Sequence, residues 1–380
     1  MTLDNRAILR AAVNTPTQHG WGLPMLIEGK PGSGKTSAVE AEADRMGMPI
    51  ETIIASLREP QDFNGFPVPS GDSIKLIPPE WAKRLANAER GIAFFDELNT
   101  AAPSVQAALL RVVLSGVVGG FKLPGGIRFI AAQNSVEDAA GGWDLAPPMA
   151  NRFGHLEWDA PRVDDWVTWL MGVDTDDDKF ECSAADIEGG VMAKWGGEFA
   201  KAKGQVAGFL RRRPELMLQM PNSNSPDASK AWPSPRSWEN ATRAIASANI
   251  HGLSEESTDV FVGSFIGNGA AIEYQSWLNK ADLPDPADVL DGKVSFQHDD
   301  FRLDRTAAVL SGCAALVVSC DDKKLQKSRA DKLWSILTPL CTEYADITIH
   351  AAQALVKKRL VSAASRKALA TLQPVLQVSR

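Results

Sequence analysis

The chain has 380 residues, of which 44% are hydrophobic and 23% are charged, a composition typical of folded proteins with buried cores. Its length predicts about two to three domains. The 40 Lys and Arg residues are outnumbered by 47 Asp and Glu residues, so the formal net charge is −7. That balance argues against a protein whose main task is to coat nucleic acid.

The cysteine content and the hydrophobic runs exclude two further classes of protein, disulfide-rich and membrane-spanning ones. The four cysteines show no C-x-x-C spacing, which excludes a disulfide framework. The longest nearly apolar run, 307–318, is shorter than the roughly 20 residues that a membrane span needs. The amino terminus carries no apolar stretch of the signal-peptide type. We therefore expect a cytoplasmic protein with no membrane partner.

The first 160 residues alternate short apolar runs with helical patterns, which predicts an α/β domain with a largely parallel sheet. Strands are expected at 23–28, 50–55, 91–95, 128–132 and 155–158, and helices at 36–45, 79–88 and 103–117. Two segments interrupt this alternation. Residues 66–77 are typical of a hairpin-like insertion, and the glycine-rich 116–126 of a second exposed loop or hairpin.

The remainder of the chain is predicted to be helical. An acid-rich loop is expected at 174–188, a linker at 221–230 and a domain boundary at 283–297, and a helix should begin at Ser234 and Pro235. The further helices are predicted at 187–211, 303–320, 324–344, 347–360 and 362–372. These patterns divide the chain into a nucleotide-binding α/β core (1–160), a helical lid with an acidic insertion (161–282) and a helical bundle (283–380).

The strongest motif is a P-loop that lies between a predicted strand and a predicted helix. It consists of Gly29, Lys30, Pro31, Gly32, Ser33, Gly34, Lys35 and Thr36, followed by Ser37. The glycines let successive backbone N–H groups and the helix N-terminus point at a phosphate. Lys35 would reach the β- and γ-phosphates, and Thr36 would ligate Mg²⁺. The motif predicts a nucleotide site.

Two further strand ends carry polar residues suited to hydrolysis. The apolar run 91–95 ends in Asp96 and Glu97. Asp96 would hold Mg²⁺ through water, and Glu97 would orient and deprotonate the attacking water. The strand at 128–132 leads to Asn134, whose amide could sense the γ-phosphate; its alternative role is to cap the following turn.

Four stretches together resemble MoxR-type AAA+ ATPases. Residues 94–110 are similar to the family's Walker B segment, 131–134 to its sensor 1 segment, 145–153 to its stretch ending in Asp-Arg-Phe, and 232–236 to its sensor 2 motif. The resemblance runs from about residue 23 to residue 249, in the family's order. The family's usual Asp is replaced here by Asn151, and a frequent Glu by Arg111.

The resemblance implies an α/β fold: a P-loop AAA+ parallel-sheet core with a helical lid, to which this chain adds a C-terminal helical bundle. It implies ATP and Mg²⁺ as cofactors, Asn134 as sensor 1, Arg152 as an arginine finger facing a neighbouring subunit, and Arg236 as sensor 2. Arg236 could fold over the nucleotide of its own chain. The resemblance also implies a homo-oligomeric ring, expected to be a hexamer. Residues 66–77 and 116–126 would then face the pore or a client.

The sequence thus predicts an ATP hydrolase that remodels or activates a client protein, and the resemblance suggests a partner with a von Willebrand factor A domain. Two alternatives remain open on the same core. One is a nucleic-acid-stimulated motor or loader, and the other is a scaffold that binds nucleotide without hydrolysing it.

The acidity is concentrated in one segment. Residues 157–188 carry eleven acidic and two basic side chains, a local charge of −9, and the rest of the chain is nearly neutral. We expect either a solvated surface loop or a docking site for a basic partner.

Overall fold

A computed structural model describes residues 4–135, 142–171, 182–222, 225–362 and 365–378. By their internal contacts these residues form two compact units. Unit 1 is Met1–Met192 with Gln219–Asn268, and unit 2 is Ala193–Leu218 with Gly269–Arg380. The long helix α8 (Ala184–Arg212) passes from the first unit into the second.

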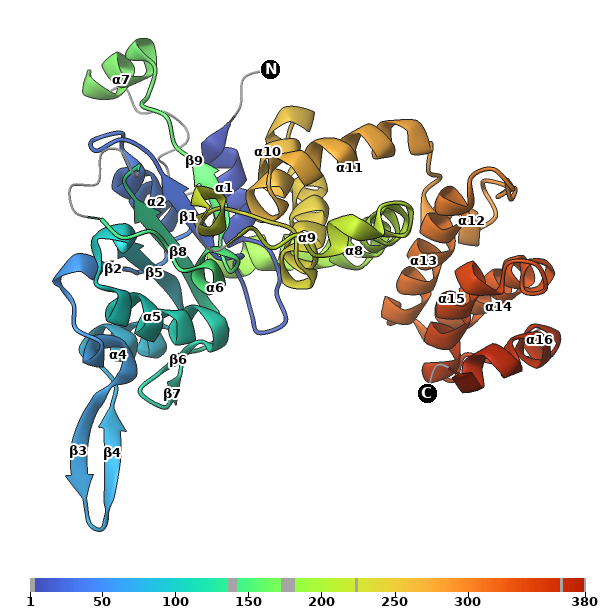
Figure 1. Cartoon of the computed structure of the whole chain (residues 1–380), viewed down its shortest axis with the longest axis horizontal. Helices are drawn as coiled ribbons and strands as arrows, with labels where there is room; N and C mark the ends of the chain where they lie inside the picture. The colour runs from blue at the N-terminus through green and yellow to red at the C-terminus, as the bar shows by residue number, and fades with distance from the viewer. Residues whose placement is uncertain (1–3, 136–141, 172–181, 223–224, 363–364, 379–380) are drawn as a thin grey trace. The chain divides into compact units, whose positions relative to one another are not determined.

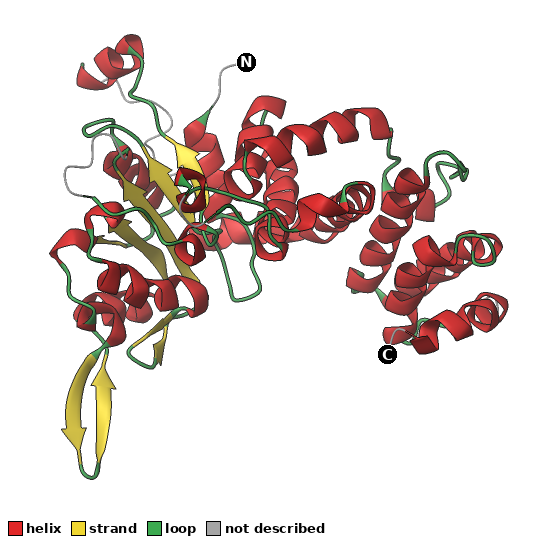
Figure 2. Ribbon diagram, viewed as in Figure 1, coloured by secondary structure: helices red, strands yellow, loops and turns green. Residues whose placement is uncertain are grey.

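Unit 1 is an α/β unit with helices around one central sheet (Figure 1, Figure 2). Its strands are β1 (Met25–Glu28), β2 (Ile50–Ile54), β3 (Phe66–Ser70), β4 (Ser73–Ile77), β5 (Arg90–Asp96), β6 (Val117–Val118), β7 (Phe121–Lys122), β8 (Gly126–Gln133) and β9 (Gly154–Glu157). Its helices are α1 (Asn5–Val13), α2 (Lys35–Arg45), α3 (Gln61–Asn64), α4 (Glu80–Ala88), α5 (Pro103–Ser115), α6 (Pro147–Ala150), α7 (Val163–Leu170), α9 (Pro235–His251) and α10 (Glu255–Ile266).

The central sheet has five parallel strands in the order β2-β5-β8-β1-β9. Its inner strands are mainly apolar because helices cover both faces of a parallel sheet, and the buried Arg128 of β8 is an exception. Phe94 and Phe95 of β5 illustrate this, since both side chains are fully buried. Phe95 packs edge-on against Phe63 of α3 and Trp81 of α4, and these rings belong to the core beneath the sheet.

Both predicted insertions form two-stranded hairpins. β3 pairs with β4, and β6 pairs with β7, each antiparallel. The base of the first hairpin touches the turn of the second, because Gly65 before β3 and Gly119 between β6 and β7 approach so closely that a Cβ on either would lie within 2.8 Å of the other's Cα. The β3–β4 hairpin projects well beyond the rest of unit 1 (Figure 1).

Helix α9 begins where the sequence predicts a helix start. Ser234 caps α9 by accepting a hydrogen bond from the Ser237 amide, and Pro235 is the first helical residue. Helix α9 packs against α10 and against α1. Ser247 on α9 donates a hydrogen bond to the Ala11 carbonyl of α1, which attaches α9 to the first helix of the chain.

Unit 2 is entirely helical in its described part. It comprises the second half of α8 with α11 (Asn268–Ala281), α12 (Pro286–Leu290), α13 (Leu303–Ser319), α14 (Lys323–Leu340), α15 (Ala345–Lys357) and α16 (Ser365–Val378). Trp334 and Leu333 of α14 are fully buried in its core. At Gly204 of α8 a side chain would collide with the backbone of Gly312 on α13, so the two helices depend on glycine for their close approach.

The predicted α/β fold class is confirmed: a parallel five-stranded sheet is flanked by helices, and the C-terminal part of the described chain is helical. The AAA+ and lid assignments stay predictions. Two local expectations change. Helix α8 starts at Ala184, inside the segment 174–188 that was expected to be an acid-rich loop, and residues 174–181 of that segment lie outside the described residues. The segment predicted as a boundary contains α12, whose Val289 and Leu290 are buried inside unit 2. The division at residues 160 and 282 stays a prediction.

None of the helices in the described part of the chain is long and apolar enough to span a membrane.

Candidate active site

The strand order determines which loops meet at the carboxyl edge of the sheet, where open α/β sheets bind their ligands. β8 lies between β1 and β5. The residue that follows β8, Asn134, therefore comes between the loop after β1 and the carboxylates at the end of β5. The structure thus brings the P-loop, Asn134, Asp96 and Glu97 to one edge of unit 1.

The P-loop depends on glycine for two different reasons. Gly32 and Gly34 have φ values of +75° and +86°, a left-handed conformation that other residues rarely adopt. At Gly29 the reason is space, because a Cβ there would lie 2.2 Å from the Trp158 carbonyl oxygen at the end of β9. These glycines shape the turn that leads into α2.

The ammonium group of Lys35 holds the loop together. Its Nζ donates hydrogen bonds to the carbonyl oxygens of Gly29 and Lys30, at 2.7 and 3.0 Å. A third bond, 3.1 Å long, goes to Oδ1 of Asn134. Lys35 is itself buried, so the charge is directed at the inside of the loop. Lys35, which is predicted to bind the phosphates, is thus hydrogen-bonded directly to Asn134, which is predicted to sense the γ-phosphate.

The two residues predicted to hold Mg²⁺ lie together. Thr36 Oγ1 donates a 3.0 Å hydrogen bond to Oδ2 of Asp96. Thr36 is in the first turn of α2 and Asp96 ends β5, so the contact joins the phosphate loop to the carboxylate strand. A hydroxyl and a carboxylate are the hard oxygen ligands that Mg²⁺ prefers. Their placement fits a metal ion bound beside a phosphate.

Glu97 occupies a backbone conformation unusual for a residue with a side chain. Its φ is +57°, and its amide donates to Asp96 Oδ1 at 2.8 Å. Such strained backbone is concentrated at functional sites. The Glu97 carboxylate is not free, because Ser56, just after β2, donates a 2.5 Å hydrogen bond to its Oε2.

Sequence reasoning missed two residues of this site. Ser56 lies in a segment with no recognisable motif, and only the pairing of β2 with β5 brings it beside Glu97. Asn99 is buried, and its amide donates to the Asn134 carbonyl at 2.9 Å, which braces the segment after β8. The position of Asn99 two residues after Glu97 was the available signal for it.

The site also contains a buried polar atom that fits a phosphate ligand. Ser33 is 4% exposed, and its Oγ has no hydrogen-bond partner among the described residues. An unpaired buried hydroxyl is costly, so its persistence indicates a polar ligand at that point. Among the other loop residues, Lys30 and Pro31 are exposed at the surface of the turn.

The two predicted arginines lie at the opposite edge of the sheet. β9 pairs with β1 so that Gly154 lies beside Met25, the first residue of β1. Arg152 precedes Gly154 and therefore belongs to the amino edge. Arg236, near the start of α9, lies beside it, with Nη1 3.4 Å from Oδ1 of Asn151. The structure does not bring Arg236 to the P-loop of its own chain.

Asn151 connects the arginine-bearing segments. Its side-chain amide donates to the Trp232 carbonyl at 3.1 Å, and its Oδ1 accepts a 2.8 Å bond from the Ser234 hydroxyl. An aspartate could accept but could not donate. The departure from the resemblance at this position therefore has a structural reason, since Asn151 joins the start of β9 to the start of α9.

The guanidinium groups at this edge are poorly neutralised. Arg152 donates to the Pro148 carbonyl, and its Nε is buried without a partner among the described residues. Burial, and then the charge of Arg236, lower the pKa of Arg152 from its ordinary value. A cavity of about 240 Å³ is lined by both arginines and by Lys122. Within the described chain no carboxylate forms an ion pair with Arg152 or Arg236.

Comparisons with known proteins add little to this geometry. No protein-family model and no curated protein matches the sequence. Among solved structures, the chain is similar to a "putative ATPase" from Cytophaga hutchinsonii, with 17% sequence identity and a TM-score of 0.47. The similarity covers 73% of this chain and 88% of that one.

Proposed function

We propose that this chain is a MoxR-like AAA+ ATPase that hydrolyses ATP with Mg²⁺ in a closed ring and uses the energy to remodel a client protein. The observation that carries the proposal is the hydrogen bond from Thr36 to Asp96, with Lys35, Asn134 and Glu97 at the same sheet edge. The loop, the metal ligands and the base needed for phosphoryl transfer to water are thus contributed by neighbouring strands.

The residues have distinct chemical roles in this proposal. The P-loop amides and Lys35 would bind the phosphates, and Thr36 and Asp96 would hold Mg²⁺. When bound, Mg²⁺ would neutralise charge on the phosphates. Glu97 would accept a proton from the water that attacks the γ-phosphorus, and Asn134 would orient that water or the γ-phosphate. Ser56 holds the Glu97 carboxylate and would have to release it.

The ring is proposed because the two edges of the sheet are far apart along the strands. Arg152 and Arg236 lie at the amino edge and the P-loop lies at the carboxyl edge, so neither arginine can serve the nucleotide of its own chain. A neighbouring copy, placed head to tail, would bring both guanidinium groups to that nucleotide. Repeated head-to-tail contacts close into rings when the rotation allows it. We propose a hexamer, the state that the resemblance implies.

The hydrolysis is tested with Glu97→Gln, which keeps the shape of the side chain and removes the base. We expect ATP binding to be retained and kcat to fall by about 10²- to 10⁴-fold. Equal hydrolysis by the variant and the wild type would disprove the assignment of Glu97. Failure of the wild type to hydrolyse ATP would favour the scaffold alternative, and strong stimulation by nucleic acid would favour the motor alternative.

The transfer of arginines between subunits has its own test. Glu97→Gln and Arg152→Ala should each be inactive alone. Mixed rings should regain activity, because an Arg152→Ala subunit keeps its base and can receive Arg152 from a Glu97→Gln neighbour. Absence of any recovery in rings shown to be mixed would argue against the trans arrangement.

A client and a partner with a von Willebrand factor A domain are also proposed, on the strength of the resemblance alone. Such a partner would present the client to the ring. Glu97→Gln held in ATP should retain both, and mass spectrometry of what co-purifies would identify them. Recovery of the ring alone would contradict this part of the proposal.

A further inference from the structure

The β3–β4 hairpin is a ribbon with every strand residue exposed to solvent. A two-stranded hairpin is only marginally stable in water, and each of its edges presents backbone groups that another strand could pair with. Its two edges are not equivalent, because the residues of the two strands differ in what their backbones can donate.

The register of the hairpin determines which amides face outward. Ser70 pairs with Ser73 across the turn formed by Gly71 and Asp72, and Gly71 has a φ of +61°. Residues of an antiparallel pair alternate between positions whose N–H points at the partner strand and positions whose N–H points away. Because proline has no N–H, Pro67 and Pro69 can occupy only the outward positions.

The prolines therefore close the outer edge of β3. At both outward positions that edge has a carbonyl but no amide donor, so no strand can form a regular ladder with it. The open edge is that of β4. The partners of the two prolines are Leu76 and Ile74, and their N–H and C=O groups both point outward. Within the described chain neither amide bonds to another segment.

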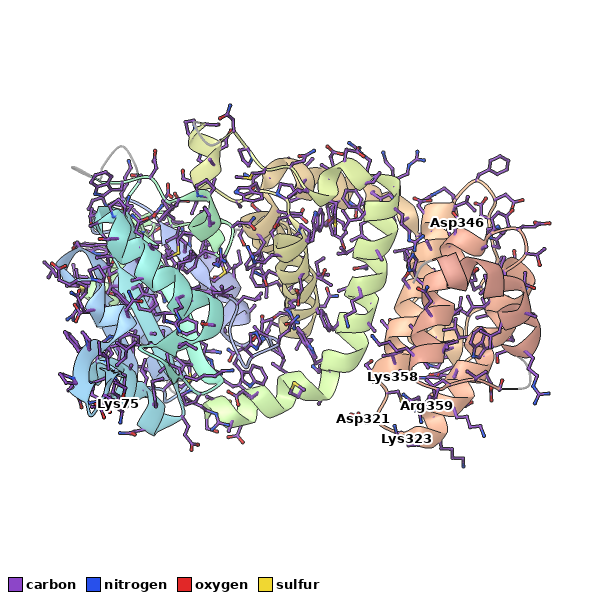
Figure 3. All side chains as sticks on the ribbon, turned by 60° about the horizontal axis from the view of Figure 1, so that its bottom comes forward. Lys75, Asp321, Lys323, Asp346, Lys358 and Arg359 are labelled. Carbon is purple, nitrogen blue, oxygen red and sulfur yellow. The ribbon has the colours of Figure 1, made fainter. Side chains whose placement is uncertain are left out.

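The side chains along the open edge show what could pair with it. Ile74 and Leu76 share one face of the ribbon with Pro67 and Pro69, so this face is wholly apolar. Ile74 is 73% exposed. The opposite face carries Lys75 beside Val68. The Lys75 ammonium has no ion-pair partner within the described residues, and Figure 3 labels it on the hairpin.

We propose that the outer edge of β4 binds an extended polypeptide segment as a third strand. The segment alternates apolar residues, which cover Ile74 and Leu76, with acidic residues, one of which pairs with Lys75. Backbone hydrogen bonds supply affinity in this mode of recognition, and alternate side chains supply specificity. The inference deepens the proposed function and rests on it, because it defines the part of a client that the ring would contact.

A second copy of the chain is a poorer occupant of this edge. The closed edge of β3 prevents a β4–β3 pairing between copies. A β4–β4 pairing would be twofold symmetric, whereas the transfer of Arg152 between subunits needs a head-to-tail contact. An extended segment of another protein meets neither difficulty.

The test uses the full chain and a fluorescent peptide of four Val-Glu repeats, with binding measured by anisotropy. The variant Ile74→Pro/Leu76→Pro removes both outward amides at positions where proline is compatible with the ribbon, as β3 shows. The matched control Ile74→Ala/Leu76→Ala removes the same side chains and keeps the amides. We expect the proline variant to bind at least about tenfold more weakly than the alanine variant. Equal binding by the two would overturn the proposal.

Charge provides a second readout. Lys75→Glu should weaken binding of the Val-Glu peptide and strengthen binding of a Val-Lys peptide of the same length. If the wild type binds both peptides equally, the acidic part of the proposed ligand is wrong. ATP hydrolysis is measured on every variant, and the hairpin substitutions should leave the basal rate unchanged. If the wild type binds the peptide normally but does not hydrolyse ATP, the proposed ATPase activity is contradicted and the proposed binding of a third strand is not.

Discussion

The two edges of the central sheet differ in how their charged groups are neutralised. At the carboxyl edge, Lys35 is bonded to Asn134, Thr36 to Asp96, and Ser56 to Glu97. At the amino edge, Arg152 and Arg236 lie side by side over a cavity without a carboxylate partner in the described chain. The first edge is organised by a single chain. At the second, Arg152 and Arg236 have no acidic partner within the described residues, and in the proposed ring the neighbouring subunit's nucleotide would supply the anion.

A contrasting arginine shows that the amino edge is not uniformly unpaired. Arg128 of β8 is 1% exposed and pairs with Glu188 of α8 at 2.7 Å. Burial lowers the pKa of Arg128, and Glu188 raises it. Glu188 also contacts Arg90, at 3.2 Å. Glu188 was one of the acids expected in a loop or docking segment, but its role is structural, since it attaches α8 to the sheet.

The strongest way to break the carboxyl edge is Lys35→Ala. The change removes an ammonium group together with its bonds to Gly29, Lys30 and Asn134, so we expect ATP affinity to fall by at least about 100-fold. Lys30→Ala is the matched control, because Lys30 is in the same loop but exposed, and it should change affinity by less than about threefold. Binding is measured with a fluorescent ATP analogue. Similar losses of ATP affinity in both variants would show that affinity depends on the total positive charge of the loop and not on the position of Lys35.

Removing an arginine from the amino edge should lower the rate of ATP hydrolysis and leave ATP binding intact. We expect Arg152→Ala to lower kcat by about 10³-fold with ATP affinity nearly unchanged, because an arginine finger stabilises charge that develops during transfer. Arg111→Ala, on the exposed side of α5, serves as the control for loss of one surface arginine. Steady-state hydrolysis and equilibrium binding together check this. A large loss of affinity in Arg152→Ala would contradict the proposed separation of the two edges.

The link between the two arginine-bearing segments is tested by Asn151→Asp. The carboxylate cannot donate to the Trp232 carbonyl, which would lose one of its two hydrogen bonds and keep the 3.0 Å bond from the Ser237 hydroxyl. We expect the free energy of unfolding to fall by about 0.5–1.5 kcal/mol, the contribution of one hydrogen bond. Thermal or denaturant unfolding measures it, and Asn151→Ser, which keeps a donor, should cost less. Unchanged stability in the aspartate variant would mean that the bond contributes little.

The smallest effect is expected at Ser56. Ser56→Ala removes the hydrogen bond that occupies Glu97 Oε2, so the carboxylate becomes available to water. We expect basal kcat to rise by about threefold with KM unchanged, the size of effect that one hydrogen bond gives. Ser56→Thr keeps the hydroxyl and should behave as the wild type. A fall in kcat in Ser56→Ala would instead make Ser56 a residue that positions Glu97 for catalysis.

Much of the fold was predictable because periodicity and turn chemistry are local. The alternation of apolar runs placed all five sheet strands to within about two residues, and Ser234 with Pro235 marked the start of α9. The extent of the acid-rich loop was wrong. Charge density favours a loop, but Glu188 finds a buried partner in Arg128, and α8 therefore begins earlier at Ala184.

The sequence by itself determined the P-loop, the carboxylates after β5 and the proline pattern of the hairpin, because each depends on residues that are neighbours in the chain. Only the tertiary structure decided which of them meet. The insertion of β8 between β1 and β5 brings Asn134 to Lys35, and the pairing of β2 with β5 brings Ser56 to Glu97. The register of β9 on β1 places Arg152 and Arg236 away from their own P-loop. The physical reason is that all strands of a parallel sheet start at one edge and end at the other, so residues before β9 and residues after β1 lie at opposite edges.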